Sequence, residues 1–422
     1  MILEFKVKNF LSFKEEQTIS FEASTDKYLE DYHCILADKD TKVLRMCMIY
    51  GANASGKSNL LIALDFLKKI CLETKERNEK TGFIPFSFDQ KTKYEPGQFE
   101  ISFFTEGHRY VYSITIDNKL VYEEKLIYYP GAQPALIFHR QYQKSEDDYS
   151  LKTGSKIKVS QVELAVLKSN SLNNMSIISG MSKTNIKFQE LNVVYNWFNN
   201  ILNEIIKPSH DLYRETITQI LHQPVQFKEF IFNGLEKADF NISDIYIEPE
   251  NDIIAENRDY KFAEDINLQA SYRRKDVYFL HSNKYGDNVF TEKLDIKFQS
   301  AGTLKYFGLL GLIKMAIDNH KIINFDELEN SLHPELINHL LNTYLYHSKL
   351  SSSNSQFIFT THNIDLLASD FVRKDIVWFS EKQSNGSTNL YSLSDFDIRK
   401  NLSFVNAYKA GKFGAFPNLG II

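Results

Sequence analysis

The chain has 422 residues, of which 43% are hydrophobic and 24% are charged, and its formal net charge is −5. This composition is that of a folded globular protein. The net charge excludes a global positive field that would attract nucleic acid, but it does not exclude a local basic groove. Three cysteines without a C-x-x-C pair exclude a disulfide framework, and no apolar run reaches the roughly 18 residues that a membrane helix needs, so we expect a cytoplasmic protein without a membrane partner.

Residues 1–150 predict an N-terminal lobe of strands around one helix. Partial alternation of Ile2, Phe5 and Val7 predicts a first strand, and the run VLRMCMIY predicts a buried strand that enters a glycine-containing loop. Apolar residues at helical spacing then predict a buried helix from about Ser58 to Glu73. The stretches FEISFF, RYVYSITI and KLVYEEKLIYY predict an antiparallel meander between about Phe99 and Tyr129.

Residues 151–275 predict an inserted, mainly helical lobe. Within it ELNVVYNWFNNILNEII has the apolar spacing of a helix, whereas residues 244–275 are charged and weakly periodic, which predicts a peripheral hairpin or a mobile segment. Residues 276–422 return to strand and helix alternation, with the apolar runs IINF and QFIFT on either side of a helix from about His333 to Leu345. This alternation favours a parallel α/β architecture.

The segment GANASGKS matches the phosphate-loop pattern G-x-x-x-x-G-K-[ST] at every specified position, and it lies between the predicted strand and the predicted helix. In such a loop backbone N–H groups point at the phosphates, Lys57 reaches the terminal phosphates and the Ser58 hydroxyl binds Mg²⁺. The alternative is a glycine-rich turn with an incidental lysine, which the flanking elements disfavour. The nucleotide-binding residues predicted in this loop are Gly51, Asn53, Ala54, Ser55, Gly56, Lys57 and Ser58.

Two carboxylates follow the apolar strand IINF. The carboxyl ends of parallel strands lie at the same edge of the sheet as the phosphate loop. We therefore expect Asp326 to hold Mg²⁺ through water and Glu327 to orient or deprotonate the water that attacks the γ-phosphate. An exposed acidic helix cap is the alternative. In FIFTTHN, His362 follows another apolar strand, where it is expected to sense the γ-phosphate; a solvated histidine is the alternative there.

A further segment, SAGT, precedes a strongly apolar helix. The Ser300 hydroxyl and the backbone N–H groups near Gly302 are placed to meet an anion at that helix N-terminus. Taken alone, this is the pattern of an ordinary N-cap. Its position about 24 residues before the acidic pair is what favours an anion-binding role.

The order GANASGKSN, SAGT, FDELENSLHP and TTHN resembles the ABC-class ATPases related to the SMC and RecF proteins, and above all the small AAA-family ATPases of abortive-infection and anti-phage systems. The opening LEFKVKNFLSF, Asn59 after the loop serine and the closing KAGKFGAFPNLG are also similar to that group. The resemblance implies an ABC-type P-loop head with a mixed sheet, an antiparallel β-subdomain and an inserted helical lobe. It also implies a homodimer or higher homo-oligomer with a head-to-tail interface, in which Lys57 and Ser58 of one chain and Ser300 and Gly302 of the other enclose one ATP with Mg²⁺.

Some assignments stay open within this resemblance. Gln90 and Gln98 lie near the strand expected to carry a Q-loop glutamine, but each is also typical of a surface residue. Asn330, Ser331 and His333 match the segment that touches the opposite subunit in the family, and His333 before Pro334 equally indicates a helix start. Ala54 stands where many related loops have glycine.

The resemblance also bears on what the ATPase is for. Related overcoming-lysogenization-defect proteins carry a Toprim nuclease domain after the ATPase, whereas about 60 residues follow His362 here. We therefore expect a dimeric ATP-driven sensor or scaffold that controls a separate effector, a nuclease or toxin, in anti-phage defence. The alternatives are a RecF-like repair ATPase whose partner is nucleic acid, and a self-contained nuclease.

Overall fold

The computed structural model describes residues 1–248, 276–285, 288–397 and 403–415. The chain packs as two compact units. Unit 1 comprises Met1–His210, Met315–Asn330 and Leu341–Ile422, and unit 2 comprises Asp211–Lys314 and Ser331–Leu340. The predicted lobe boundaries at residues 150 and 275 divide the chain differently, since residues 151–210 pack within unit 1; the three-lobe division stays a prediction.

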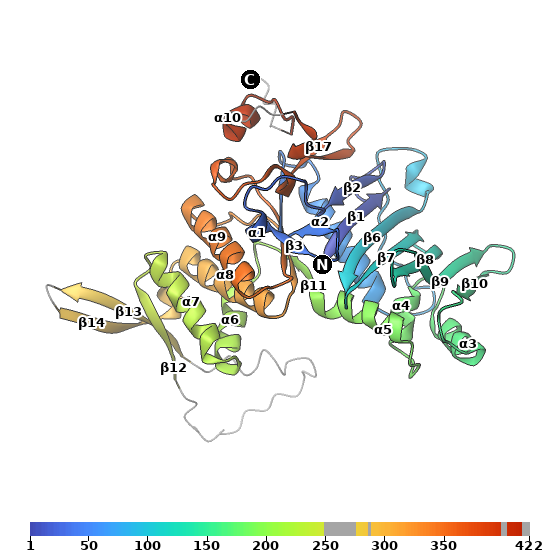
Figure 1. The fold of residues 1–422 in the computed structure, drawn as a ribbon, viewed down its shortest axis with the longest axis horizontal. Helices are drawn as coiled ribbons and strands as arrows, with labels where there is room; N and C mark the ends of the chain where they lie inside the picture. The colour runs from blue at the N-terminus through green and yellow to red at the C-terminus, as the bar shows by residue number, and fades with distance from the viewer. Residues whose placement is uncertain (249–275, 286–287, 398–402, 416–422) are drawn as a thin grey trace, which may run out of the picture. The chain divides into compact units, whose positions relative to one another are not determined.

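A six-stranded sheet in unit 1 carries the predicted phosphate loop, and two of its strands, β11 and β17, are labelled in Figure 1. Three of its four inner strands, β15, β16 and β5, pair in parallel, and every one of their residues is buried. Near-continuous apolar runs are what a parallel strand covered on both faces requires. The strand order is β11 (Leu202–Ile206), β15 (Ile322–Phe325), β16 (Gln356–Thr360), β5 (Met46–Tyr50), β17 (Val377–Lys382) and β18 (Thr388–Ser392), and only β18 runs antiparallel to its neighbour.

The second large sheet of unit 1 is antiparallel throughout and has seven strands. It confirms the predicted meander and extends it by two strands at one edge and two at the other. Helix α2 (Lys57–Leu72) shares one hydrophobic core with this sheet and with β5; for example, the Phe66 ring lies 5.0 Å from that of Phe10 and 5.1 Å from that of Phe99. The strand order is β10 (Asp148–Thr153), β9 (Ala135–Gln143), β8 (Val121–Tyr129), β7 (His108–Ile116), β6 (Gly97–Thr105), β1 (Ile2–Lys8) and β2 (Gln17–Ser20).

One predicted helix is only partly helical. In ELNVVYNWFNNILNEII, helix α5 (Gln189–Asn196) is followed by a π-helical turn (Trp197–Ile201) and then by strand β11. The Trp197 ring stacks on Phe103 at 3.9 Å, and Leu202 pairs with Ile322 at the edge of the six-stranded sheet. These tertiary contacts outweigh the helical spacing, so the end of this stretch is a strand although its apolar spacing is that of a helix.

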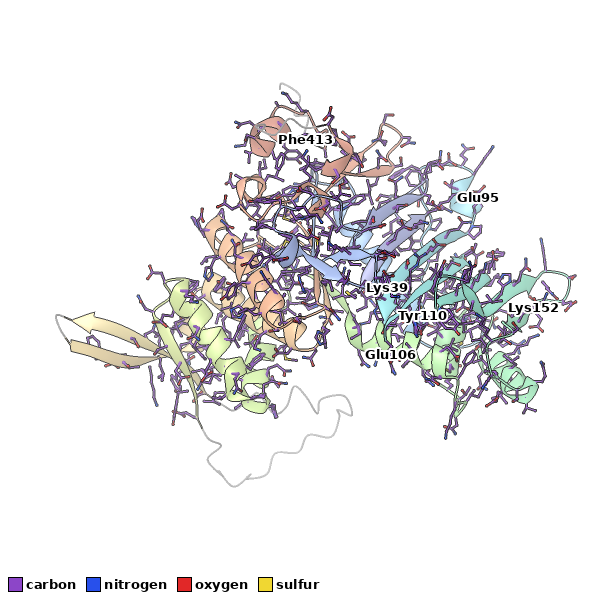
Figure 2. The ribbon with its side chains drawn as sticks, in the orientation of Figure 1. Lys39, Glu95, Glu106, Tyr110, Lys152 and Phe413 are labelled. Atoms are coloured by element: carbon purple, nitrogen blue, oxygen red, sulfur yellow. The ribbon has the colours of Figure 1, made fainter. Side chains whose placement is uncertain are left out.

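The remaining elements of unit 1 are short. The ring of Phe413, labelled in Figure 2, packs on Phe379 at 5.7 Å and on Phe396 at 5.2 Å, which fastens the C-terminal segment to β17. The elements are α1 (Glu30–His33), β3 (Cys34–Leu36), β4 (Lys42–Leu44), α3 (Gln161–Asn170), α4 (Ile177–Met181) and α10 (Phe404–Lys409).

Unit 2 combines helices with a three-stranded antiparallel sheet. Residues 301–314 of α8 (Ala301–Asp318) pack closely on α6 (Leu212–His222). Glycine at position 308 permits this approach, since a Cβ there would lie 2.7 Å from the Leu212 Cβ. The predicted segment 244–275 begins within strand β12, and residues 249–275 lie outside the described part of the chain. The other elements are α7 (Val225–Lys237), β12 (Ile242–Ile247), β13 (Val277–Tyr285), β14 (Asn288–Asp295) and the start of α9 (Pro334–Leu350).

The sequence-based expectation of an α/β fold with a mixed sheet is confirmed by this arrangement. Across the described residues, every helix falls short of the length or the hydropathy that a membrane span requires.

Candidate nucleotide site

The phosphate loop joins β5 to α2, as the sequence predicts. The Lys57 side chain is buried, and its ammonium donates hydrogen bonds to the carbonyl oxygens of Gly51 at 2.8 Å and Ala52 at 3.0 Å. Burial lowers the pKa of Lys57 to about 8, while the carboxylates of Glu329, Asp326 and Glu327 act to raise it. Because both hydrogen-bond partners of this cation are neutral carbonyls, its charge remains available to bind an anion.

The backbone of the loop adopts conformations that favour glycine. Gly56 has a φ of 105°, and a Cβ there would lie 2.1 Å from the Thr388 Oγ1 and 2.7 Å from the Ser12 Oγ. Ala54 has a φ of 60°, in the left-handed region that costs an L-residue with a Cβ about 1–2 kcal/mol. The alanine is therefore accommodated with some strain, which a glycine at that position would avoid.

Three distant segments hold this loop from outside. The Ser55 carbonyl oxygen accepts hydrogen bonds from the Ser380 hydroxyl at 2.9 Å and the Thr388 hydroxyl at 2.7 Å. The Ser12 hydroxyl accepts from the Asn59 side-chain amide at 2.8 Å and lies 2.8 Å from the Thr388 hydroxyl. Asn59, predicted from the family resemblance, therefore supports the loop through Ser12. Sequence reasoning did not find the other three hydroxyl residues, because an isolated serine or threonine has no distinguishing spacing.

The acidic strand end lies against the start of α2. The Ser58 hydroxyl donates to the Asp326 Oδ1 at 2.9 Å, and the Thr360 hydroxyl donates to the same oxygen at 2.6 Å. Thr360 also accepts the backbone N–H of Glu327 at 2.8 Å, while the Glu327 side chain is exposed. A hydroxyl and a carboxylate in contact are hard oxygen donors of the kind that Mg²⁺ prefers, so these residues fit the predicted metal. Thr360 was present in the predicted TTHN motif, but sequence reasoning gave it no role.

His362 follows the neighbouring strand β16. Partial burial lowers the pKa of His362, and the charge of Lys57 lowers it further. The carboxylates of Glu329, Glu327 and Asp326 act to raise this pKa, but the net shift is downward. The backbone N–H of His362 donates a hydrogen bond to the Glu329 Oε1. The ends of β5, β15 and β16 thus bring together five predicted site residues, namely Lys57, Ser58, Asp326, Glu327 and His362.

The remaining loop residues differ in their burial. Gly51 is buried, and a Cβ there would lie 2.3 Å from the Ser380 carbonyl oxygen. Asn53 and Ala54 are exposed at the tip of the loop. Neither side chain is therefore needed to hold the loop, which leaves the tip accessible.

The predicted signature residues belong to unit 2, so they are described by themselves. The Ser300 hydroxyl accepts the backbone N–H of Thr303 at 3.0 Å and lies 2.8 Å from the Thr303 hydroxyl, so it caps α8. A Cβ at Gly302 would lie 3.1 Å from the Ser331 carbonyl oxygen, a close approach that favours glycine. The N-cap alternative therefore holds locally, and the anion-binding role of Ser300 and Gly302 stays a prediction.

The assignments that the sequence left open are resolved only in part. Helix α9 begins at Pro334, and the backbone N–H of Leu336 donates to the His333 carbonyl oxygen at 3.0 Å, which confirms a helix start. A contact of Asn330, Ser331 or His333 with another subunit stays a prediction.

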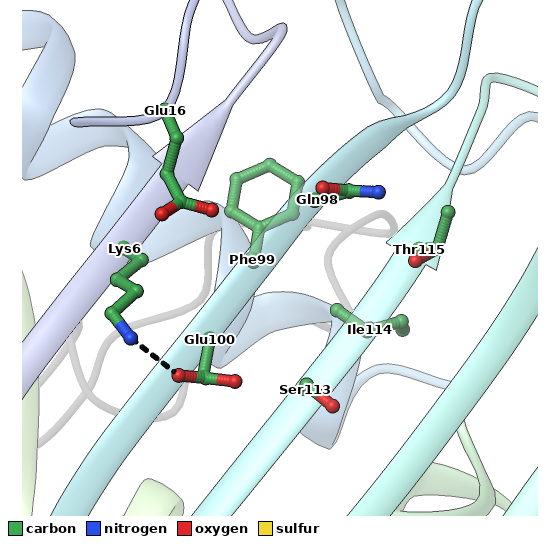
Figure 3. Close-up of a pocket in the computed structure, with 8 residues that line it drawn as sticks. All are labelled: Lys6, Glu16, Gln98, Phe99, Glu100, Ser113, Ile114 and Thr115. Carbon is green, nitrogen blue, oxygen red and sulfur yellow. Dashed lines mark hydrogen bonds and ion pairs between the residues drawn. The ribbon is translucent and has the colours of Figure 1, made fainter. Parts of the chain in front are cut away.

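Both candidate Q-loop glutamines are exposed. Gln98 lines a pocket of about 160 Å³ on the seven-stranded sheet, where Lys6 pairs with Glu100 at 2.9 Å (Figure 3). None of the predicted site residues lines this pocket, and the Q-loop assignment stays open.

Comparison with known proteins places this site in a family. Residues 46–369 match the family model described as "AAA domain, putative AbiEii toxin, Type IV TA system". That match spans the phosphate loop, the signature segment, the acidic strand end and His362. No curated protein sequence matches the chain.

Solved structures show a distant likeness. The SMC head domain from Thermotoga maritima is 14% identical with a TM-score of 0.41, covering 93% of this chain and 98% of that one. An SmcHead bound to the C-winged helix domain of ScpA is 14% identical with a TM-score of 0.40, covering 97% and 99%. An Smc head domain with an extended coiled coil, bound to the C-terminal domain of ScpA derived from Pyrococcus furiosus, is 12% identical with a TM-score of 0.40, covering 98% and 98%.

Proposed function

Because the chain belongs to the AAA-domain family described as "putative AbiEii toxin, Type IV TA system", we propose that it binds and hydrolyses ATP and uses that cycle to control a separate effector in anti-phage defence. The single observation that supports this proposal most is the contact between the phosphate loop and the acidic strand end, where Ser58 donates to Asp326 at 2.9 Å. Residues 268 positions apart in the chain meet there beside a buried lysine.

The loop supplies the phosphate-binding groups. Backbone N–H groups at the start of α2 and the Lys57 ammonium bind the terminal phosphates, which replace the carbonyls of Gly51 and Ala52 as partners of Lys57. Ser58 and Asp326 would hold Mg²⁺, which when bound neutralises charge on the phosphate oxygens. Thr360 helps to keep the Asp326 carboxylate in place through a second hydroxyl hydrogen bond to the same oxygen.

Hydrolysis needs a positioned water. Glu327 orients or deprotonates that water, because its side chain is exposed while its backbone N–H is fixed on the Thr360 hydroxyl. The Glu327 backbone has a φ of 52°, an uncommon conformation for a residue with a Cβ that is often found at functional sites. His362 follows the next strand and senses the γ-phosphate.

A second chain completes the site in this proposal. The start of α8 presents backbone N–H groups capped by Ser300, which is the kind of helix N-terminus that binds phosphate. The exposed Glu327 leaves the hydrolytic side of the loop open to such a partner. We therefore propose a head-to-tail homodimer in which Ser300 and Gly302 of each chain close over the ATP of the other.

The effector is a nuclease or toxin encoded separately from this chain. The family description, which names a toxin and a toxin–antitoxin system, supports a role in defence. Closure of the dimer on ATP and its release on hydrolysis provide two states that an effector can distinguish.

A mixing experiment tests the proposed shared site. Lys57→Ala and Ser300→Arg proteins are each expected to be inactive in ATP hydrolysis. Their equimolar mixture should regain up to about a quarter of wild-type activity, because half of randomly paired dimers are mixed and each mixed dimer keeps one intact site of two.

The matched control is a mixture of Lys57→Ala with Glu327→Gln. Those two residues act on the same nucleotide from the same chain, so this mixture should stay inactive. If the first mixture also stays inactive while both variants fold, Ser300 does not act on the partner's nucleotide. A wild-type protein that does not hydrolyse ATP would contradict the proposed activity itself.

A further inference from the structure

Glu329 is an acidic residue to which the sequence assigns no role. It lies two residues after Glu327, in the segment that leaves β15, and its Oε1 accepts the backbone N–H of His362 in the segment that leaves β16. The intervening Leu328 is fully buried. Glu329 is therefore held at the carboxyl edge of the sheet between two predicted catalytic residues.

This hydrogen bond is the last of three successive links between the two segments. The Glu327 N–H donates to the Thr360 hydroxyl at 2.8 Å, and the Leu328 N–H donates to the Thr360 carbonyl oxygen at 3.2 Å. Two of the links use the backbone of residues 327 and 328, so they persist whatever the side chain at 329. The third depends on the Glu329 carboxylate alone, and it is the link that reaches His362.

The second carboxylate oxygen is left without a hydrogen bond. Glu329 Oε2 is buried and has no hydrogen-bond partner among the described residues, and the same is true of the Tyr50 hydroxyl at the end of β5. Glu329 is also the acid that acts most strongly on both Tyr50 and Lys57. The carboxylate thus lies where β5, β15 and β16 end, with one oxygen bonded to the His362 N–H and the other unpartnered.

We propose that Glu329 is a positioning residue for ATP hydrolysis, whose carboxylate fixes the backbone of His362 and thereby places the imidazole at the γ-phosphate. The inference rests on the proposed function, because it assigns Glu329 to the hydrolytic step. Since Glu329 is bonded to neither Ser58 nor Asp326 in the structure, it acts through His362. A glutamine retains an oxygen acceptor of the same reach, whereas alanine removes it and aspartate shortens it by one methylene.

Steady-state hydrolysis and ATP binding of three variants test this role. Glu329→Ala and Glu329→Asp should lower kcat by about tenfold or more, whereas Glu329→Gln should stay within about threefold of wild type. The Kd for ATP should not rise in Glu329→Gln, because the variant removes a negative charge next to Lys57. Glu329→Asp keeps the negative charge and should still hydrolyse ATP slowly, whereas Glu329→Gln loses the charge and should hydrolyse ATP well. This difference separates a positioning role from a purely electrostatic one.

A double-mutant comparison asks whether Glu329 acts through His362. Glu329→Ala combined with His362→Ala should be no slower than the slower single variant, since both remove the same placed imidazole. Glu106→Ala, in the exposed turn between β6 and β7 (Figure 2), is the matched control and should match wild type. Multiplying effects in the double variant, or a wild-type kcat in Glu329→Ala, would overturn the proposal.

Amide hydrogen exchange provides a readout that does not require hydrolysis. In the intact chain the His362 amide should exchange slowly and should lose protection in Glu329→Ala but not in Glu329→Gln. Equal exchange in all three proteins would overturn the proposal even if ATP is hydrolysed. Conversely, lost protection in a chain that hydrolyses no ATP would leave the hydrogen bond established and the proposed function contradicted.

Discussion

The phosphate loop of unit 1 and the start of α8 in unit 2 are both predicted to bind the same nucleotide, but they are built differently. Around the loop, the Ser55 carbonyl and the Asp326 carboxylate oxygen each accept two side-chain hydroxyl hydrogen bonds from distant segments. At α8, the Ser300 hydroxyl bonds within its own turn, to the hydroxyl and the backbone N–H of Thr303. One chain therefore preorganises the proposed triphosphate site by itself, whereas the proposed role of the helix end depends on a partner.

The largest expected effect is on hydrolysis at the preorganised site. Glu327→Gln should keep ATP binding and slow hydrolysis by at least about 100-fold, because the exposed carboxylate that activates water is lost while the loop stays intact. Light scattering after size exclusion should then detect a dimer trapped by ATP. Rapid hydrolysis by this variant would remove Glu327 from its assigned role.

A smaller loss should follow from loosening the acid without removing it. Thr360→Val deletes the hydroxyl that bonds both Asp326 and the Glu327 N–H, and it leaves that N–H without its acceptor. We expect kcat to fall about tenfold and the free energy of unfolding to fall by about 1–3 kcal/mol, measured by steady-state kinetics and urea denaturation. Thr360→Ser keeps the hydroxyl and should restore most of both; equal losses in the two variants would point to packing instead.

At the start of α8 the expected change in stability is smaller. Ser300→Ala removes one N-cap acceptor and should cost about 1 kcal/mol in urea denaturation, with ATP binding by the monomer unchanged. Ser300→Thr keeps an acceptor and serves as the control. Weakened ATP binding by monomeric Ser300→Ala would show that the helix end serves its own chain's nucleotide.

The smallest effect should come from relieving strain in the loop. Ala54→Gly should raise the free energy of unfolding by about 1 kcal/mol or less, because glycine adopts the φ of 60° without a Cβ penalty. Ala52→Gly is the control, since Ala52 does not have a positive φ, and it should be neutral or destabilising. Destabilisation by Ala54→Gly would show that the alanine side chain supports the loop.

The sequence predicted the parts of the site whose residue types recur at fixed spacing. The phosphate loop could be found because lysine and serine must follow glycine at set positions between a strand and a helix, and Asp326 could be found because it ends an apolar strand. Ser12, Thr388 and Thr360 could not, because their roles depend on strand pairing between distant segments. Glu329 was hidden for the same reason, since its partner is the backbone of His362.

The same limit applies to the fold. Residues 202–206 have the local apolar spacing of a helix, but their pairing with β15 decides their conformation. The meander was predicted correctly because turn residues and β-branched residues specify hairpins locally. Local patterns thus predicted hairpins and helices, whereas the edge strand of the central sheet required knowledge of its neighbour.

Titration of wild-type and Lys57→Ala protein with a non-hydrolysable ATP analogue and Mg²⁺, followed by calorimetry, tests the central claim most directly. We predict saturable binding to the wild type and binding at least about 100-fold weaker to Lys57→Ala, because the variant loses the buried cation at the loop. No binding to the wild type, or equal binding to both proteins, would contradict the assignment of this loop as the nucleotide site.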